Sequence, residues 1–248
     1  MQRRVTAARA ALAVALSGAV AVSCTGSLTG EDTAGGNGAA GAASTTAAPG
    51  SHSVLPEPCG AVPESTLSGL LPDAAPQALD GEPALTYDIG RRVGCTWRSP
   101  SDAGTHRLEI DFERVVSYVR GTSDDDQAAQ DFRRRAADLG IRLDPREGTA
   151  PAGPPPERMR PVPSDAPAGE FAPRALEGIG NAAYVDDRLT TTQSGARRDV
   201  TLAFHSGNVI VTVRYAQAVT EPARSPGSAG LQEGATEVAR HLAERFSS

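Results

Sequence analysis

Two segments of this chain lack the apolar residues that a folded core requires. From residue 25 to residue 53, 23 of 29 residues are Gly, Ala, Ser or Thr, and residues 144–173 include nine prolines among 30 residues. Neither segment can bury enough apolar surface to offset the conformational entropy lost on ordering. We therefore expect a flexible tether over residues 24–53 and a disordered Pro-rich insertion over residues 144–173. The rest of residues 54–248 has the size of a single domain.

The first 23 residues have the plan of a secretory signal peptide. Three arginines precede an apolar stretch over residues 10–22, which is too short to span a bilayer. Residues 21–24 read Ala-Val-Ser-Cys, and this resembles the lipobox of bacterial lipoproteins. The resemblance implies cleavage before Cys24, a lipid on its sulfur, and export to the outer leaflet of the cytoplasmic membrane. The alternative is cleavage after Ala21, which leaves Cys24 unlipidated.

The cysteine count agrees with export. If Cys24 carries lipid, Cys59 and Cys95 are the only remaining pair, and outside the cytoplasm they are expected to form a disulfide. Closing a loop of this length stabilises the fold by roughly 4 kcal/mol in the chain-entropy account. A metal site at these cysteines is the alternative, but it lacks further ligands at a suitable spacing.

Composition excludes several classes of function. All 24 basic residues are arginine, so a Walker A loop, a Schiff-base enzyme and a Ser-x-x-Lys acyltransferase are excluded. The net charge is −6 and no basic run is present, so no nucleic-acid partner is expected. We expect no cofactor.

Hydrophobic periodicity predicts a mixture of strands and helices. Residues 106–112 alternate apolar and polar side chains, which is typical of a half-buried strand. Ser123 followed by three aspartates has the pattern of a helix N-terminus, and Gly140 is expected to end this helix. The other expected elements are helices over 63–71 and 231–246, strands over 84–89, 93–98 and 182–186, and a hairpin of strands 200–204 and 209–215.

This order of elements predicts an α+β fold. Strands joined by tight turns form antiparallel sheets, and the few separated helices must pack on them. We expect one domain with an antiparallel sheet, or sheets, of about six strands and two or three helices. Each half of the domain reads strand, strand, strand, helix, which is compatible with internal duplication.

Short motifs occur at four places in the expected domain. They are Pro-Cys at residues 58–59, Gly-Cys-Thr-Trp at 94–97, Gly-Ile-Gly-Asn-Ala-Ala at 178–183, and the alternating hairpin before the C-terminal helix. Together they resemble the actinobacterial lipoprotein family catalogued as domain of unknown function 3558, over about residues 55–246. The resemblance implies a lipid-anchored envelope protein with Cys59 bonded to Cys95, and it implies no known reaction. The chain departs from the family at residues 60–61 and in the Pro-rich insertion.

Three further motifs have a structural interpretation. Residues 178–183 match the dinucleotide-binding string Gly-x-Gly-x-x-Ala, but that motif requires a strand before it and a helix after it, so we interpret it as a turn. The aspartates at 124–126 lack the spacing of a calcium loop and are interpreted as a helix start. The aspartates at 186–187 are interpreted as a solvated strand end.

The remaining candidate residues are single side chains. His106 and His205 are expected on polar strand faces, and none of the four histidines accompanies a metal or catalytic motif. Trp97 shares a strand face with Cys95, so we expect it to pack on the disulfide; a stacking platform for a ligand is the alternative. The arginines at 133–135 are expected on a solvated helix face.

These features favour a non-catalytic, sensor-like module that binds a ligand or partner and is displayed from the membrane by its lipid anchor. The residues do not identify the small molecule or protein that it binds, and we expect neither an enzyme nor a metal site. One alternative is an envelope hydrolase whose triad assembles from distant residues, such as His205, Asp199 and a serine. Another is a structural role in envelope assembly.

Overall fold

A computed structural model of the chain describes residues 48–102, 104–143, 171–221 and 225–247. These residues fall within one compact unit, Ser44–Ser248. The expected signal peptide, Cys24, most of the tether and most of the Pro-rich insertion lie outside the described residues.

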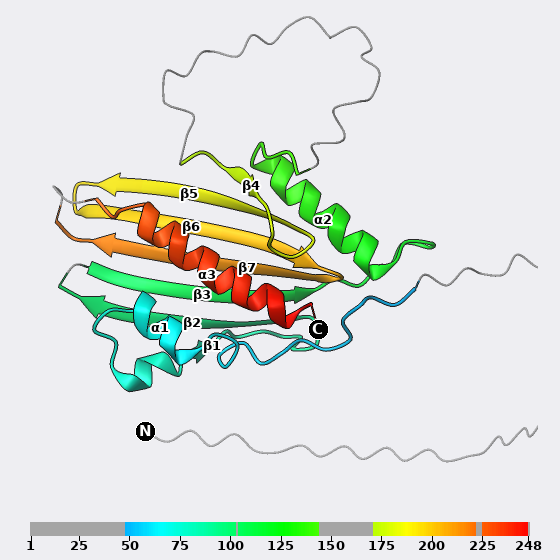
Figure 1. The fold of residues 1–248 in the computed structure, drawn as a ribbon, viewed down its shortest axis with the longest axis horizontal. Coiled ribbons are helices and arrows are strands. Elements are labelled where there is room, and N and C mark those ends of the chain that lie inside the picture. Colours follow the sequence, from blue (N-terminus) through cyan, green and yellow to red (C-terminus); the bar gives the residue numbers. More distant parts are fainter. Residues whose placement is uncertain (1–47, 103, 144–170, 222–224, 248) are drawn as a thin grey trace, which may run out of the picture. The chain divides into compact units, whose positions relative to one another are not determined.

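A seven-stranded antiparallel sheet forms the centre of the domain (Figure 1). The strand order is β1-β2-β3-β7-β6-β5-β4, so strands from the two halves of the chain meet in the middle, at β3 and β7. The expected α+β class is confirmed, with seven strands where about six were expected. The strands are β1 (Glu82–Pro83), β2 (Arg92–Ser101), β3 (Gly104–Arg114), β4 (Arg174–Leu176), β5 (Ala182–Thr192), β6 (Gly195–Ser206) and β7 (Val209–Val219).

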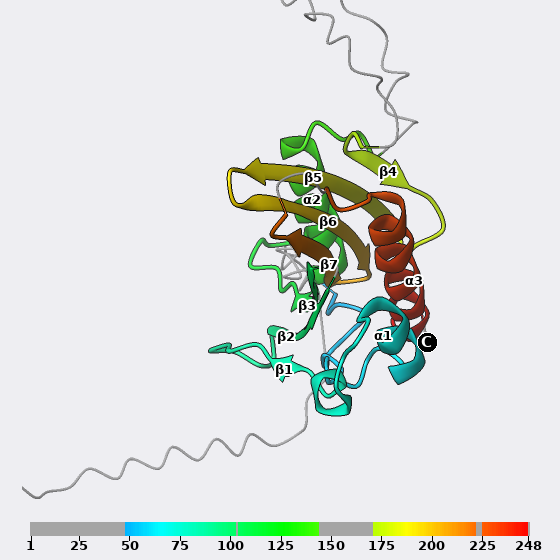
Figure 2. The ribbon, with the colours of Figure 1, turned by 90° about the vertical axis from the view of Figure 1, so that its left-hand side faces the viewer.

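Helices cover the two faces of the sheet unequally. Figure 2 shows α1 and α3 on the same side of the sheet, and the core described next joins both of them to it. Helix α2 packs on the opposite face, against one end of β6 and β7. The helices are α1 (Glu64–Leu70), α2 (Asp124–Asp138) and α3 (Ala229–Arg245), and a 3-10 turn, η1, spans Pro76–Leu79. Because α2 and α3 lie on opposite faces of the sheet, the two halves of the domain do not place their helices in equivalent positions.

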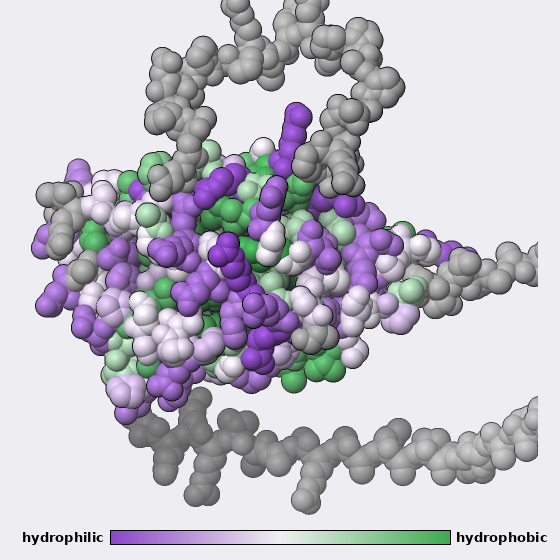
Figure 3. Space-filling view, in the orientation of Figure 1, coloured by the Kyte–Doolittle hydropathy of each residue, from purple (hydrophilic) through white to green (hydrophobic). Residues whose placement is uncertain are grey.

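The main core lies between the sheet and the pair α1 and α3. Alternate residues of β3 point into it, and Leu108, Ile110 and Phe112 are fully buried there. Helix α3 contributes one apolar stripe that includes Val238 and Leu242. Its outer side is polar, and Figure 3 shows mostly hydrophilic residues on this face of the molecule.

A smaller core holds α2 to the other face. Phe132 is fully buried against the sheet residues Tyr184, Ala203 and Ile210. Beyond α2, this face carries partly exposed charged side chains from β2, β3, β5, β6 and β7. No helix among the described residues covers this part of the sheet, which we call the open face.

The disulfide lies within the main core. Cys59 and Cys95 are bonded, with their Cα atoms 5.2 Å apart. Trp97 is buried in the same cluster and its indole N–H donates to the carbonyl of Leu79, 2.9 Å away. Gly81 has a φ of 73°, and a Cβ there would lie 2.5 Å from the Cys95 sulfur and 2.6 Å from the Trp97 Nε1. The expected packing of Trp97 beside the disulfide is therefore confirmed.

Several local expectations are also confirmed. Ser123 caps α2, since its hydroxyl oxygen accepts a hydrogen bond from the Asp126 N–H, 3.1 Å away. Gly140 follows the helix with a φ of 75°. Strands β6 and β7 are joined by the two residues Gly207 and Asn208.

The predicted strand over residues 84–89 is wrong. Pairing with β2 reaches only Ala84, whose N–H donates to the Gly94 carbonyl. Beyond it the chain forms a loop that projects from the sheet edge (Figure 2), and its alternating Leu85, Tyr87 and Ile89 are exposed. Their spacing resembles a strand, but no other part of the described chain covers them. In contrast, the strand predicted over 182–186 is much longer and continues to Thr192.

Candidate functional site

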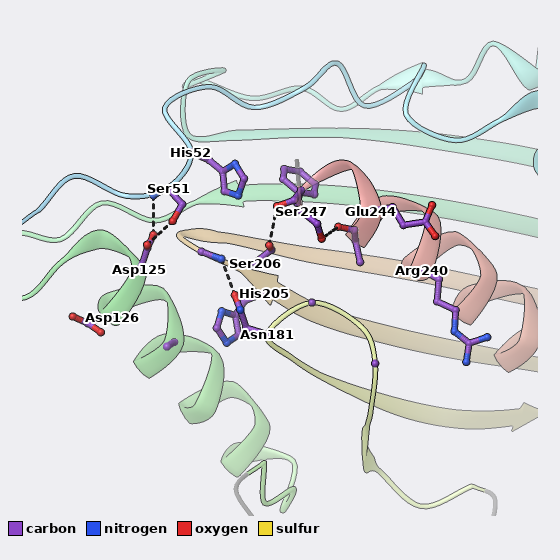
Figure 4. A pocket seen from close by; sticks show the side chains of 16 residues that line it. Ser51, His52, Asp125, Asp126, Asn181, His205, Ser206, Arg240, Glu244 and Ser247 are labelled. Atoms are coloured by element: carbon purple, nitrogen blue, oxygen red, sulfur yellow. Dashed lines mark hydrogen bonds between the residues drawn. The ribbon is translucent and has the colours of Figure 1, made fainter.

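A polar cavity of about 1010 Å³ opens at the end of the sheet where β6 turns into β7. We call it the end cavity. Figure 4 shows that its labelled side chains come from the segment before α1, the start of α2, the loop before β5, the β6–β7 turn and the end of α3. The cavity is therefore assembled only when both helices and the N-terminal segment pack on the sheet.

Residues 50–52, the N-terminal strap, form one wall of the end cavity. Asn208 holds this strap, because its side-chain amide accepts from the His52 N–H at 2.8 Å and donates to the His52 carbonyl at 3.0 Å. Asn208 is fully buried, and its amide nitrogen also contacts the Val115 carbonyl. Part of the segment that we expected to be tether is thus bound to the domain.

Two aspartates in the first turn of α2 hold loop residues at this end of the sheet. Asp124 accepts hydrogen bonds from the backbone N–H groups of Gly50 and Ser117, at 3.2 and 2.7 Å. Asp125 accepts from both the N–H and the hydroxyl of Ser51, at 2.9 and 2.6 Å. These contacts and the Ser123 cap agree with the helix-start interpretation of residues 124–126.

His205 lies beside the cavity on the face that α2 covers. Its ring lies 5.0 Å from the ring of Phe132, centroid to centroid, and its Nδ1 atom is buried without a hydrogen-bond partner. Burial lowers the pKa of His205 below its usual value of 6.5. The expectation of a polar strand face was wrong here, because helix α2 covers this end of the sheet.

The serines around the cavity donate to groups other than a histidine. Ser206 donates to the Phe246 carbonyl at 3.1 Å, and Ser247 donates to the Ala243 carbonyl at 2.8 Å (Figure 4). The suggested triad of His205 with Asp199 does not form. These two residues are six positions apart on β6, which separates them by about 20 Å. The Asp199 carboxylate accepts a hydrogen bond from Arg197 instead.

The loop before β5 lines the cavity beside the β6–β7 turn. Gly178 and Gly180 both have positive φ, 75° and 57°, which agrees with the turn interpretation of residues 178–183. A Cβ at Gly180 would lie 2.5 Å from the His205 carbonyl oxygen. Asn181 then donates its N–H to that carbonyl, and its side-chain oxygen accepts from the Gly207 N–H, both at 2.8 Å.

The cavity offers mixed polar chemistry to a ligand. Carboxylates of Asp125, Asp126 and Glu244 line it, together with the guanidinium of Arg240 and the imidazole of His205. Phe246 adds an aromatic edge that contacts His52, with ring centroids 5.4 Å apart. Such a lining suits a polar ligand with hydrogen-bonding groups and one apolar side.

Other residues singled out by sequence lie elsewhere. His106 points into the main core beside Tyr215 and not onto a polar face, so that expectation was wrong, and burial lowers its pKa. Arg135 pairs with Glu113 and Arg134 with Asp131, while Arg133 is exposed on α2. Arg133 and Arg134 are exposed, which agrees with the expected solvated helix face, and Arg135 is half-buried.

The interpretation of residues 186–187 as a solvated strand end was also wrong. Both side chains are buried within β5, and Asp187 accepts hydrogen bonds from Arg198, Ser228 and Gln232. Burial opposes ionisation of Asp187, but these hydrogen bonds outweigh it and lower its pKa below the usual 3.8. This network joins the start of α3 to the sheet and does not reach the end cavity.

No group of three or more His, Cys, Asp and Glu side chains able to hold a metal occurs in the part of the chain that the structure describes. Within the same residues, no helix is both long and apolar enough to cross a membrane. Comparisons with protein-family models, with curated proteins and with solved structures find no match to this chain.

Proposed function

We propose that the chain is a cell-envelope lipoprotein whose domain binds a ligand or partner without catalysis, with the end cavity as its binding site. The observation that carries this proposal is the cavity itself, a polar space of about 1010 Å³ assembled from five parts of the chain. Carboxylates, a guanidinium and the edge of Phe246 line this space and offer a ligand both polar and apolar contacts.

The structural context supports a binding role over a catalytic one. Nucleophilic catalysis by serine requires a hydroxyl within hydrogen-bond reach of a base. The hydroxyls of Ser206 and Ser247 instead donate to backbone carbonyls, and that of Ser51 donates to Asp125. These bonds hold the cavity walls in place.

Export and anchoring form the second part of the proposal. The Cys59–Cys95 disulfide is compatible with an oxidising compartment. The signal-like leader, Cys24 and the resemblance to the actinobacterial lipoprotein family support a lipid anchor on the outer leaflet of the cytoplasmic membrane. In this proposal the anchor holds the domain near the membrane, where it binds its ligand or partner.

Native mass spectrometry of protein purified from its own envelope tests the binding site. We expect a bound mass on the wild-type protein that Ala129→Leu removes, because Ala129 lines the cavity. Ala137→Leu is the matched control, since Ala137 is exposed on the same helix. The same bound mass on all three proteins, or none on any, contradicts a ligand in the end cavity.

Two further measurements test the other parts of the proposal. Intact mass of membrane-extracted protein should show acyl mass on Cys24 and a deficit of two hydrogens from the disulfide. Cytoplasmic protein with free thiols contradicts export. Labelling by a fluorophosphonate probe that Ser206→Ala abolishes would favour an envelope hydrolase instead.

A further inference from the structure

A second polar site lies on the open face of the sheet, apart from the end cavity. Arg98 of β2, Arg107 of β3 and Arg197 of β6 surround a shallow hollow of about 130 Å³. Its floor is formed by Ala216 and Ala218 of β7. We call this site the arginine hollow.

The strand register explains why these side chains converge. Arg98 is directly opposite Arg107 across β2 and β3, and Arg107 is directly opposite Ala216 across β3 and β7. Arg197 is opposite Ala218 in the next row. Residues that face each other in an antiparallel pair share one face of the sheet, so the arginines rise around the two small alanines.

The local charge is not balanced. Glu109 forms ion pairs with both Arg107 and Arg214, at 3.1 and 3.0 Å, and Asp199 forms an ion pair with Arg197. Among the described residues Arg98 has no hydrogen bond or ion pair. The three guanidinium groups of the hollow and the neighbouring Arg214 therefore share two carboxylates, so positive charge exceeds negative charge among these side chains. Elsewhere on this side of the sheet three arginines each pair with one acid: Arg92 with Asp111, Arg135 with Glu113 and Arg188 with Asp186.

Two features of the hollow are unfavourable without a ligand. Like charges directly opposite each other on neighbouring strands, as at Arg98 and Arg107, destabilise a sheet. The Nε atom of Arg107 is also shielded from solvent and has no hydrogen-bond partner. Both features occur at the same place in a chain whose net charge is −6. An anion in the hollow would offset the repulsion between Arg98 and Arg107.

We propose that the arginine hollow binds a phosphate group. Guanidinium groups present paired N–H donors that match phosphate oxygens, and the excess of positive charge favours an anion. The small alanine floor leaves room for a group of this size, while the rest of a larger molecule would extend into solvent. The phosphate group belongs either to a soluble compound or to a lipid headgroup.

The test is a titration of the full chain carrying Cys24→Ser with inorganic phosphate, at constant ionic strength maintained with sodium chloride. The arginine Nε–H resonances report binding by nuclear magnetic resonance. We expect a saturable shift of the Arg107 signal. Arg98→Gln should weaken binding by at least about tenfold, the effect of one charge-assisted hydrogen bond. Arg133→Gln is the matched control, since Arg133 is exposed on α2, and it should bind as wild type does.

A second variant separates binding from folding. Ala216→Leu fills the hollow without changing charge, so it should abolish the saturable shift; thermal unfolding of each variant verifies that the fold is retained. A shift that never saturates, or equal affinity in wild type and Arg98→Gln, overturns the proposal. Sedimentation with phosphatidylcholine vesicles, with and without phosphatidic acid, then identifies the source: Arg98-dependent sedimentation indicates a lipid headgroup, and its absence indicates a soluble phosphate compound.

Discussion

At the scale of single residues, two adjacent arginines of β6 have opposite environments. Arg198 is buried and its Nη1 atom lies 2.7 Å from Asp187, whose side chain is almost completely excluded from solvent. Arg197 points to the open face and pairs with Asp199 where both groups contact water. Strand alternation points these consecutive side chains to opposite faces, and only the face of Arg198 is covered, by the segment that leads into α3.

Replacing each of these arginines by methionine should therefore have very different effects. Arg198→Met leaves the Asp187 carboxylate buried without its charged partner, which is expected to cost about 3–5 kcal/mol of unfolding free energy. Arg197→Met removes an exposed pair and should change stability by at most about 1 kcal/mol. Urea unfolding of the two variants measures both values. Equal losses would show that the buried pair has no special role.

The glycines before β5 provide a second comparison. Gly178 and Gly180 both have positive φ, but only Gly180 lies against the backbone of β6. Gly178→Ala should cost about 1 kcal/mol from the backbone conformation alone. Gly180→Ala adds a clash with the His205 carbonyl and should cost about 3 kcal/mol or more. Thermal or urea unfolding measures the two losses, and similar values would contradict the tight approach.

At the scale of elements, the alternating apolar pattern occurs in two segments with different outcomes. In β3 it forms part of the main core, whereas in the loop over residues 84–91 it is exposed to solvent. The two segments have similar local spacing. Only β3 has neighbouring strands on both sides and helices above it, so only there does the pattern bury apolar surface.

Two isoleucines test this difference directly. Ile110 of β3 is fully buried, so Ile110→Ala should lower the free energy of unfolding by about 2–5 kcal/mol. Ile89 is 76% exposed in the loop, and Ile89→Ala should change it by no more than about 0.5 kcal/mol. Urea unfolding measures both. A large loss at Ile89 would mean that the loop packs against the domain.

At the scale of the whole molecule, stability should depend on pH through the two buried histidines. Burial lowers the pKa of both His106 and His205 from 6.5 in the folded state. Below about pH 6.5 the unfolded chain therefore binds more protons than the folded chain, and stability falls as the pH decreases. At higher pH both histidines are neutral in the folded and in the unfolded chain, so they no longer make stability depend on pH.

Urea unfolding between about pH 7.5 and 5 measures this dependence. Asp187 does not interfere, because its lowered pKa means that its contribution is lost only below the usual carboxyl value of 3.8. The double variant His106→Gln and His205→Gln should lose most of the slope. A wild-type protein with constant stability over this interval would contradict the burial of neutral histidines.

The disulfide also affects the stability of the whole domain, because it joins the segment before α1 to β2. Reduction should lower the free energy of unfolding by roughly 4 kcal/mol, mainly by releasing a loop with a sequence separation of 36. The measurement is urea unfolding with and without reductant. The variant with both cysteines replaced by serine should not respond to reductant, and a response there would indicate another target.

Features that depend on neighbours along the chain could be predicted from the amino-acid sequence. The cap at Ser123, the turn at Gly207, the amphipathic α3 and the strict alternation of β3 follow from local hydrogen bonding and side-chain period, and the structure has them where they were predicted. The pairing of Cys59 with Cys95 followed from counting. Which faces of the elements are covered depends instead on how the elements pack together. Helix α2 buries His205, the start of α3 surrounds Asp187, and nothing in the described chain covers Tyr87. The end cavity and the arginine hollow also depend on strand order and register, which bring together side chains that are far apart in sequence and that no local pattern relates.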